Sequence, residues 1–159
     1  MTTVRRLRDD ERDWAAGFYG EHWGSTRMVR LGELLDLRDL PAFVAEHEGE
    51  VAAVATYAIR GDRCELAGLT TSMRRVGAGS ALVEAVRAEA RQAGCSTLWV
   101  LTTNDNTPAL RFYQRAGFDL VALHRGAVEE ARRELKPEIP EVGRDGIPLS
   151  HELILELAL

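Results

Sequence analysis

The sequence has only two cysteines, Cys64 and Cys95, and they lack the close spacing of a metal-binding knuckle or a redox pair. We expect both thiols to be reduced and to lie in or near the core. The histidines show no metal-ligand spacing, so no metal site is expected. No run of residues is long and apolar enough to span a membrane, and the N-terminal segment lacks the apolar stretch of a signal peptide. These absences together predict a cytoplasmic protein.

An excess of positive charge is also missing. The 20 Lys and Arg residues are outnumbered by 25 Asp and Glu residues, which gives a formal net charge of -5. The arginines near the N-terminus are interleaved with acidic residues, so they form no basic tract. Nucleic acid and anionic membranes are therefore not expected as partners. A length of 159 residues, 45% hydrophobic content and the lack of a linker or repeat predict one domain over residues 1–159.

Hydrophobic periodicity predicts the order of the secondary-structure elements. Strands are predicted over residues 4–8, 42–47, 51–59, 64–70, 97–101, 118–124 and 151–159, and helices from Asp9 or Asp10 and over residues 77–93, 108–116 and 127–135. Residues 26–40 fit a helix and an extended chain equally well, and residues 136–148, which contain several prolines and glycines, should form an irregular loop. This order predicts an α/β fold with one mixed, mostly antiparallel sheet.

A glycine-containing turn is the most informative segment. It reads Arg74-Arg75-Val76-Gly77-Ala78-Gly79-Ser80 and lies between a predicted strand and an amphipathic helix. The two glycines let the backbone approach a ligand, and the first turn of the helix offers unpaired N–H groups to a pyrophosphate. No lysine follows, so the turn is not a P-loop, and Leu82 stands where a dinucleotide-binding fingerprint needs its third glycine. Taken alone, the turn also fits a plain strand-to-helix connection.

A second motif, residues 106–118, follows one strand later and reads NTPALRFYQRAGF. With this motif in place, the sequence resembles the GNAT acetyltransferase superfamily. Arg74-x-x-Gly77-x-Gly79 is similar to that family's motif A, and the run from Asn106 through Tyr113 to Phe118 is similar to its motif B. The resemblance is good from about residue 43 to residue 118 and looser elsewhere. It implies a sheet that is splayed at its two central parallel strands and flanked by helices.

The resemblance implies acetyl-CoA as co-substrate. The residues implied to bind it are Leu69, Thr70, Thr71, Arg74, Arg75, Val76, Gly77, Ala78, Gly79, Ser80 and Asn106. Backbone amides of the turn would hold the pyrophosphate, and the end of the preceding strand would pair with the pantetheine arm. A backbone N–H near Leu69 would polarise the thioester carbonyl as an oxyanion hole does. Asn106 would hydrogen-bond the pantetheine.

The resemblance also implies the reaction, in which a primary amine of a small molecule or peptide attacks the thioester directly. Tyr113 would protonate the leaving thiolate as general acid, although a purely structural core tyrosine is the alternative. Glu65 would take the proton from the amine, and strand alternation predicts that it shares a face with Ala67 and Leu69. A solvated strand glutamate, with an ordered water chain as the base, is the alternative to Glu65. A non-catalytic acyl-CoA-binding module of the same fold is the alternative function.

The acceptor site is implied to lie across the sheet from the cofactor. Candidate substrate-binding residues are His22, Trp23, Tyr57 and Asp105. The first two precede a helix-breaking glycine and could equally form a packing anchor. The leucine-rich strand at residues 151–159 should be half-buried, with its glutamates on the outer face. It could complete its own sheet or pair with a second copy in a homodimer.

Overall fold

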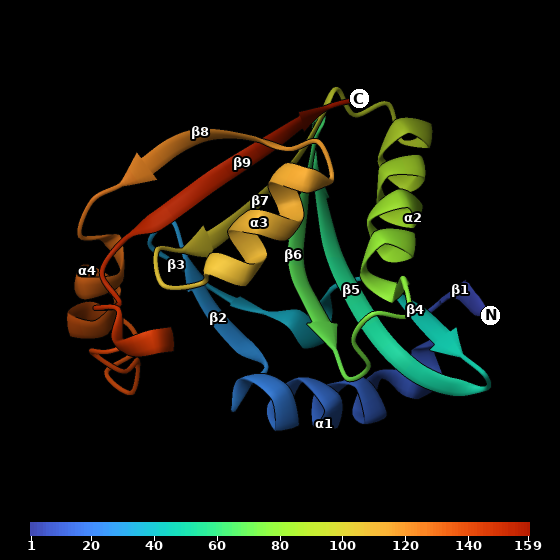
Figure 1. The fold of residues 1–159 in the computed structure, drawn as a ribbon, viewed down its shortest axis with the longest axis horizontal. Coiled ribbons are helices and arrows are strands. Elements are labelled where there is room, and N and C mark those ends of the chain that lie inside the picture. The colour runs from blue at the N-terminus through green and yellow to red at the C-terminus, as the bar shows by residue number, and fades with distance from the viewer. The chain divides into compact units, whose positions relative to one another are not determined.

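The structure is a computed structural model that describes residues 1–159 (Figure 1). Contacts between Cα atoms divide the chain into two compact units. Unit 1 consists of Met1–Thr26, Asp36–Leu98 and Ala158–Leu159, and unit 2 consists of Arg27–Leu35 and Trp99–Leu157. No helix is long and apolar enough to cross a membrane.

Unit 1 is built on an antiparallel run of four strands in the order β1-β4-β5-β6. Its elements are β1 (Thr2–Arg6), the 3-10 helix η1 (Asp9–Glu11), α1 (Arg12–Trp23), η2 (Leu37–Asp39), β4 (Ala42–His47), β5 (Glu50–Arg60), β6 (Arg63–Thr71) and α2 (Ala78–Gln92). The three strands predicted within residues 42–70 are confirmed, and they form an antiparallel meander. The first helix begins at Arg12 rather than at the predicted aspartates, because the three acidic residues before it form a separate 3-10 turn.

The two faces of this sheet carry different helices. Tyr57 of β5 lies on the α2 side, since the Arg6 guanidinium donates both to its hydroxyl and to the carboxylate of Glu89 in α2. The opposite face meets α1, since the indole N–H of Trp23 donates to the hydroxyl of Thr70 in β6. Cross-strand neighbours share a face, so the register of β5 with β6 assigns each paired β6 residue to one side or the other.

That register contains a bulge that corrects the predicted alternation. Gly68 lies opposite Thr56 and Leu66 lies opposite Tyr57, so Ala67 is an extra residue with no β5 partner. An extra residue shifts the alternation by one position. Glu65 therefore shares the α1 face with Gly68 and not, as predicted, with Leu69. The prediction failed because a bulge depends on the neighbouring strand and leaves no mark in local periodicity.

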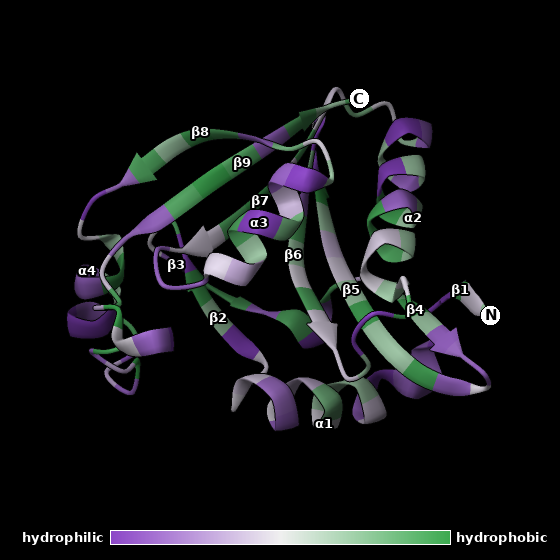
Figure 2. Ribbon diagram, in the orientation of Figure 1, coloured by the Kyte–Doolittle hydropathy of each residue, from purple (hydrophilic) through white to green (hydrophobic).

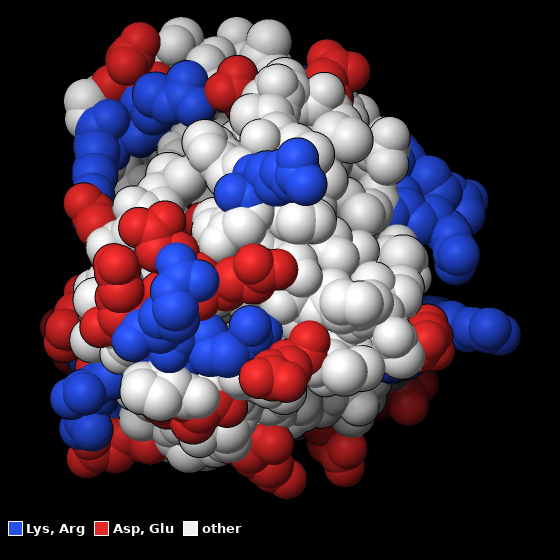
Figure 3. Space-filling view, turned by 90° about the vertical axis from the view of Figure 1, so that its left-hand side faces the viewer, with Lys and Arg blue, Asp and Glu red and all other residues white.

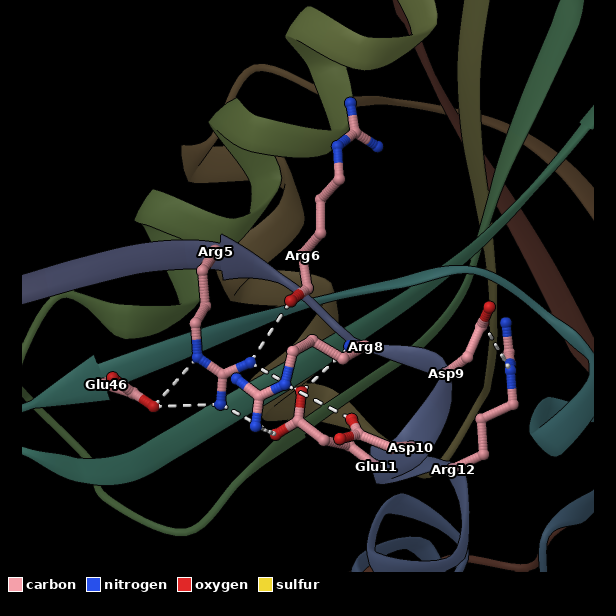
Figure 4. A network of polar contacts seen from close by, with 8 residues as sticks. All are labelled: Arg5, Arg6, Arg8, Asp9, Asp10, Glu11, Arg12 and Glu46. Atoms are coloured by element: carbon pink, nitrogen blue, oxygen red, sulfur yellow. Dashed lines mark hydrogen bonds and ion pairs between the residues drawn. The ribbon is translucent and has the colours of Figure 1, made fainter.

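An ion-pair network fixes the N-terminal strand to the start of α1 (Figure 4). The Arg5 guanidinium donates to both carboxylate oxygens of Glu11, at 2.7 and 2.9 Å, and to Glu46 at 3.0 Å. The Glu11 carboxylate also accepts the backbone N–H of Arg8. These bonds lower the pKa of Glu11 from 4.5 to about 2, the Arg5 bond having the largest effect. The network is structural and makes no use of the predicted site residues.

The core of unit 1 is formed where α2 packs on the sheet. Leu82, Val86 and Ala90 of α2 have no exposed surface. Burying a valine or leucine side chain fully stabilises a fold by about 1.5 to 3 kcal/mol. The predicted location of the cysteines is confirmed, since Cys64 and Cys95 are both buried. Burial raises the pKa of the Cys64 thiol to about 12, so it stays protonated and unreactive at neutral pH.

Unit 2 contains strands in the order β7-β9-β8, with β8 and β9 antiparallel, and a separate hairpin of β2 and β3. Its elements are β2 (Arg27–Arg30), β3 (Glu33–Asp36), β7 (Thr97–Thr103), α3 (Thr107–Arg115), β8 (Asp119–His124), α4 (Ala127–Glu134), η3 (Arg144–Gly146) and β9 (Glu152–Ala158); β3, β7 and β9 each extend by one or two residues into unit 1. The hairpin resolves the ambiguity of residues 26–40. Contrary to the predicted outer face of the last strand, Glu152 is only 3% exposed, because its carboxylate accepts the backbone N–H of Leu31 at the hairpin tip.

Candidate active site

The predicted site residues lie in both units. Unit 1 holds the residues from Glu65 to Ser80 together with His22, Trp23 and Tyr57, and unit 2 holds Asp105, Asn106 and Tyr113. The geometry of each group is described within its own unit.

The turn before α2 has the backbone shape of an anion site. Arg75 adopts a positive φ of 63° and Gly77 a positive φ of 77°, so the chain turns sharply twice before the helix begins at Ala78. The N–H groups in the first turn of a helix have no intrahelical acceptor and carry the positive end of its dipole. No atom lies within 4 Å of the place where Gly77 would carry a Cβ, so this backbone faces open space. The exposed side chains of Arg74 and Arg75 add positive charge.

The strand that leads into this turn carries the predicted base. Glu65 is 5% exposed, so the alternative of a solvated strand glutamate is wrong. It lies on the α1 face of β6, whereas Leu69 and Thr71 lie on the α2 face. A buried carboxylate has a polar partner in the chain or in a ligand, because burying its charge in apolar surroundings is costly. Glu65 does have such an interaction within the chain.

Trp23 lies at the C-terminal end of α1, against the same face of β6 as Glu65. Its indole N–H donates to Thr70 at 2.5 Å, and the indole is still 40% exposed. The neighbouring His22 is exposed; its Nδ1 lies 2.8 Å from the carbonyl oxygen of Phe18, and its ring packs on the Phe18 ring with centroids 4.4 Å apart. Trp23 is therefore both a packing residue and an accessible aromatic surface. Its contact with Thr70 is a long-range one that the sequence alone did not reveal.

Tyr57 does not lie with the other predicted substrate-binding residues of unit 1. It is 4% exposed and stacks on Phe43, with ring centroids 5.5 Å apart. Its hydroxyl accepts from Arg6 on the α2 side of the sheet. The prediction placed Tyr57 in the acceptor site, across the sheet from the cofactor, but its strand phase directs it to the α2 face, the face of the turn predicted to bind the cofactor. The structure thus argues against a role for Tyr57 in binding an acceptor beside α1.

Tyr113 has the environment of a tyrosine that could donate a proton. Its side chain is 6% exposed and packs edge-on against Phe112 and Phe118. Its hydroxyl makes no hydrogen bond to another residue of the chain, which contradicts the alternative of a structural tyrosine with a satisfied hydroxyl. Burial raises the pKa of Tyr113, so the phenol stays protonated at neutral pH.

Asn106 and Asp105 are neighbours with different tasks. Asn106 is the N-cap of α3, where its Oδ1 accepts the backbone N–H of Ala109 at 3.3 Å and leaves the amide NH2 to donate elsewhere. Asp105 is buried, and both its carboxylate oxygens are engaged, one by the Thr103 hydroxyl and one by the backbone N–H of Arg144. Asp105 therefore ties the loop after β7 to the chain before β9. This geometry argues against the predicted substrate-binding role.

The family model described as "Acetyltransferase (GNAT) family" matches residues 8–118. The chain is similar to the uncharacterized protein YdhI of Bacillus subtilis (strain 168), with 39% identity over 138 residues that cover 86% of each chain.

Among solved structures, the fold is similar to that of an IAA acetyltransferase from Bacillus cereus ATCC 14579, with a TM-score of 0.77, 18% identity and coverage of 100% of both chains. It is also similar to a GNAT family acetyltransferase from Elizabethkingia anophelis with acetyl-CoA bound, with a TM-score of 0.67, 15% identity and coverage of 99% of this chain and 98% of the other.

These likenesses confirm the α/β fold class with a mixed, mostly antiparallel sheet, and they confirm the predicted family. The turn before α2 fits the pyrophosphate of the family's donor on the geometry given above, namely two positive φ angles, unpaired helix amides and open space at Gly77. The chain belongs to the acetyltransferase (GNAT) family: it is an acetyltransferase, with acetyl-CoA as its co-substrate.

Proposed function

We propose that the protein transfers the acetyl group of acetyl-CoA to a primary amine of a small molecule or peptide, by direct attack of the amine on the thioester. The observation that carries this proposal is Tyr113: the residue is only 6% exposed, and its hydroxyl has no hydrogen-bond partner in the chain and is therefore available to a ligand. A protonated phenol suits the donation of a proton to a leaving thiolate.

In this proposal the backbone amides from Arg75 to Ser80 hold the pyrophosphate, and Arg74 adds charge beside them. The backbone of Leu69, Thr70 and Thr71 pairs with the pantetheine arm, and the amide NH2 of Asn106 donates to it. Acetyl-CoA supplies the activated acetyl group. The support for these roles is the shape of the turn together with the similarity to the family motifs.

Glu65 is the proposed base. Amines are largely protonated near neutral pH, so one proton must leave before the nitrogen can attack. Glu65 lies buried on the α1 face of β6, the face that also meets Trp23 through Thr70. His22 and Trp23 are then the proposed acceptor contacts, because Trp23 combines exposed aromatic surface with a fixed position on this face.

The first test is the release of CoA from acetyl-CoA over a broad panel of amines, with wild type and Tyr113→Phe compared. Tyr113→Phe removes only a hydroxyl that has no partner, so the fold should keep its melting temperature. We expect kcat to fall by about 10²- to 10⁴-fold, the usual contribution of a general acid. Unchanged kcat in Tyr113→Phe would refute the acid role. Stabilisation by acetyl-CoA without turnover of any amine would refute transfer to a free amine in favour of a binding module.

The base is tested by Glu65→Gln, with Glu84→Gln as the matched control. Glu84 is exposed on α2 and pairs only with Arg87, 3.5 Å away, so its loss should leave the activity unchanged. Glu65→Gln should lower kcat and remove the lower limb of the pH–rate profile. If the profile keeps that limb, the base is another group, such as an ordered water chain.

The proposal includes the whole chain, residues 1–159, as one functional domain. It also places the enzyme in the cytoplasm. The two buried thiols, unbridged in this structure, are compatible with the reducing conditions there.

A further inference from the structure

The N-terminal strand is bonded to the turn before α2. The hydroxyl of Thr2 in β1 donates to the carbonyl oxygen of Val76, inside that turn, at 2.7 Å. The Thr2 oxygen also lies 3.0 Å from Nδ1 of His47, the residue opposite Thr2 in β4. Figure 1 shows β1 beside β4, near the end of α2 at which the turn lies. Thr2 and Val76 are 74 positions apart in the sequence, so the contact is not part of the turn's own local structure.

The two hydrogen bonds of Thr2 form a chain with one direction. A hydroxyl has a single hydrogen, and that of Thr2 goes to the carbonyl oxygen of Val76, which can only accept. The Thr2 oxygen then accepts from His47, whose Nδ1 carries the hydrogen. The imidazole therefore fixes the rotation of the hydroxyl, and the hydroxyl fixes the Val76 carbonyl. All three residues are half-buried, where water competes less for such bonds.

The bond to Val76 sets the direction of the next N–H group. The carbonyl of Val76 and the N–H of Gly77 belong to one peptide unit, and in a trans peptide they point to opposite sides. The carbonyl points to β1, so the Gly77 N–H points away from β1. No acceptor in the chain takes this N–H, and Gly77 borders open space. The Gly77 N–H is therefore a free donor with a fixed direction.

Without the Thr2 bond, this peptide unit would be free to turn over. Glycine tolerates nearly all backbone conformations, so a flip of the unit between Val76 and Gly77 would meet little steric resistance. A flipped unit would present its carbonyl oxygen, rather than its N–H, to a bound anion and would repel it. The Thr2 hydroxyl supplies the restraint that the glycine lacks.

The positive charge around the turn is not neutralised within the chain. Arg74 and Arg75 are exposed and form no ion pair with a carboxylate of the chain. Figure 2 shows hydrophilic colouring where the chain turns between β6 and α2. Positive side chains elsewhere are compensated: in the lower left of Figure 3, Lys and Arg side chains lie among Asp and Glu side chains. The turn therefore suits an anion, and the direction of its N–H groups affects how tightly the anion binds.

We propose that Thr2 is a positioning residue for the binding of acetyl-CoA, which rests on the proposed function, in that the turn holds the pyrophosphate. The Thr2 hydroxyl, oriented by His47, holds the peptide unit between Val76 and Gly77 so that the Gly77 N–H donates to the pyrophosphate. Thr2 acts through the turn and does not touch the cofactor. It also precedes residues 8–118, which the family model matches, so the family motifs do not include this contact.

The test is the dissociation constant of CoA, measured by calorimetry on the full chain. Thr2→Val suits a strand but removes the hydroxyl, so the dissociation constant should rise about tenfold, the equivalent of one hydrogen bond to a charged group. Thr2→Ser keeps the hydroxyl and should bind CoA as wild type does. Thr3→Val is the matched control, since Thr3 is exposed on the same strand and should leave CoA binding unchanged. Melting curves establish that the variants fold.

A second ligand separates the positioning of the turn from a general loss of structure. Pantetheine lacks the pyrophosphate and the nucleotide, so its dissociation constant should be the same for wild type and Thr2→Val. Equal weakening of both ligands in Thr2→Val would overturn the role of Thr2, and so would a Thr2→Val variant that binds CoA as tightly as wild type. If wild type binds CoA no more tightly than pantetheine, the placement of the pyrophosphate on the turn is wrong, and the role of Thr2 falls with it.

Discussion

Replacing Gly68 by alanine tests how tightly β6 packs against Thr56 of β5 and Leu37 of η2. A Cβ at this position would lie 2.8 Å from Oγ1 of Thr56 and 3.2 Å from Cδ1 of Leu37. The contact with Leu37 is the longer of the two, and the Thr56 hydroxyl sits on a β-branched side chain with a stiff χ1. Thr56 is 1% exposed, so it has little free space into which to move. The clash with Thr56 should therefore dominate the cost.

Overpacking of a well-packed core usually costs about 1 to 3 kcal/mol. For a chain of this size, about 2 kcal/mol corresponds to a fall in melting temperature of about 4 to 8 °C. Thr56→Ala alone should cost about 1 kcal/mol, since it removes a buried hydroxyl that donates weakly to the carbonyl of Gly68, at 3.4 Å. The double variant should then be more stable than the sum of the two single losses predicts, by about 1 kcal/mol.

The assay is denaturant unfolding of the four chains of this double-mutant cycle. Gly17→Ala is the matched control, because no atom lies within 4 Å of its added Cβ and alanine is favoured over glycine inside a helix by about 1 kcal/mol. It should stabilise the fold. The reasoning is refuted if Gly68→Ala is as stable as wild type, or if the losses from Gly68→Ala and Thr56→Ala simply add.

Three further predictions concern stability. The folded pKa of Glu11 is lowered from 4.5 to about 2, so ionised Glu11 stabilises the fold above pH 4.5 and this contribution disappears as the pH falls towards 2. Because Arg5 is partly exposed, Glu11→Gln should cost only about 1 kcal/mol at pH 7 and almost nothing near pH 2, as unfolding at both pH values will show. Gly143→Ala would press a Cβ into the Asp105 carboxylate and should cost about 1 to 3 kcal/mol, part of it recovered with Asp105→Ala in unfolding curves. Tyr19→Phe should keep or raise the melting temperature, since the Tyr19 hydroxyl is buried without a partner, and a clear fall would contradict this.

The parts of the fold that local periodicity controls could be predicted from the sequence. The helix predicted over residues 77–93 is observed as Ala78–Gln92, because an amphipathic pattern with glycines at both ends specifies its own limits. The hairpin of β2 and β3 could not be predicted. Its tight turn places Leu31 and Gly32 at positive φ, and leucine gives no signal for such a turn.

In the candidate site, too, local features could be predicted from the sequence and long-range ones could not. The glycine turn and α3 are local features: the turn was predicted at the correct residues, and the helix predicted over residues 108–116 is observed as Thr107–Arg115. The positions of Glu65, Tyr57 and Asp105 depend instead on strands and loops far away in the sequence. The bulge at Ala67 set the face of Glu65 relative to Leu69, and the Arg144 backbone engaged Asp105. Neither the bulge nor the hydrogen bond from Arg144 can be recognised from the residues that flank Glu65 or Asp105 in the sequence.

Because Ala67 is an extra residue without a partner in β5, the side chains of β6 alternate in opposite order before and after it. Upstream of it, residues at odd positions face α1, and downstream of it residues at even positions do so. The two halves can therefore vary independently: substitutions near Glu65 can alter one surface while the segment that enters the helix turn keeps its own orientation. Deletion of Ala67 would restore one regular alternation along β6. The side chains on one side of the deletion would then point to the opposite face of the sheet. For this reason, insertions and deletions in β6 should be tolerated far less than substitutions.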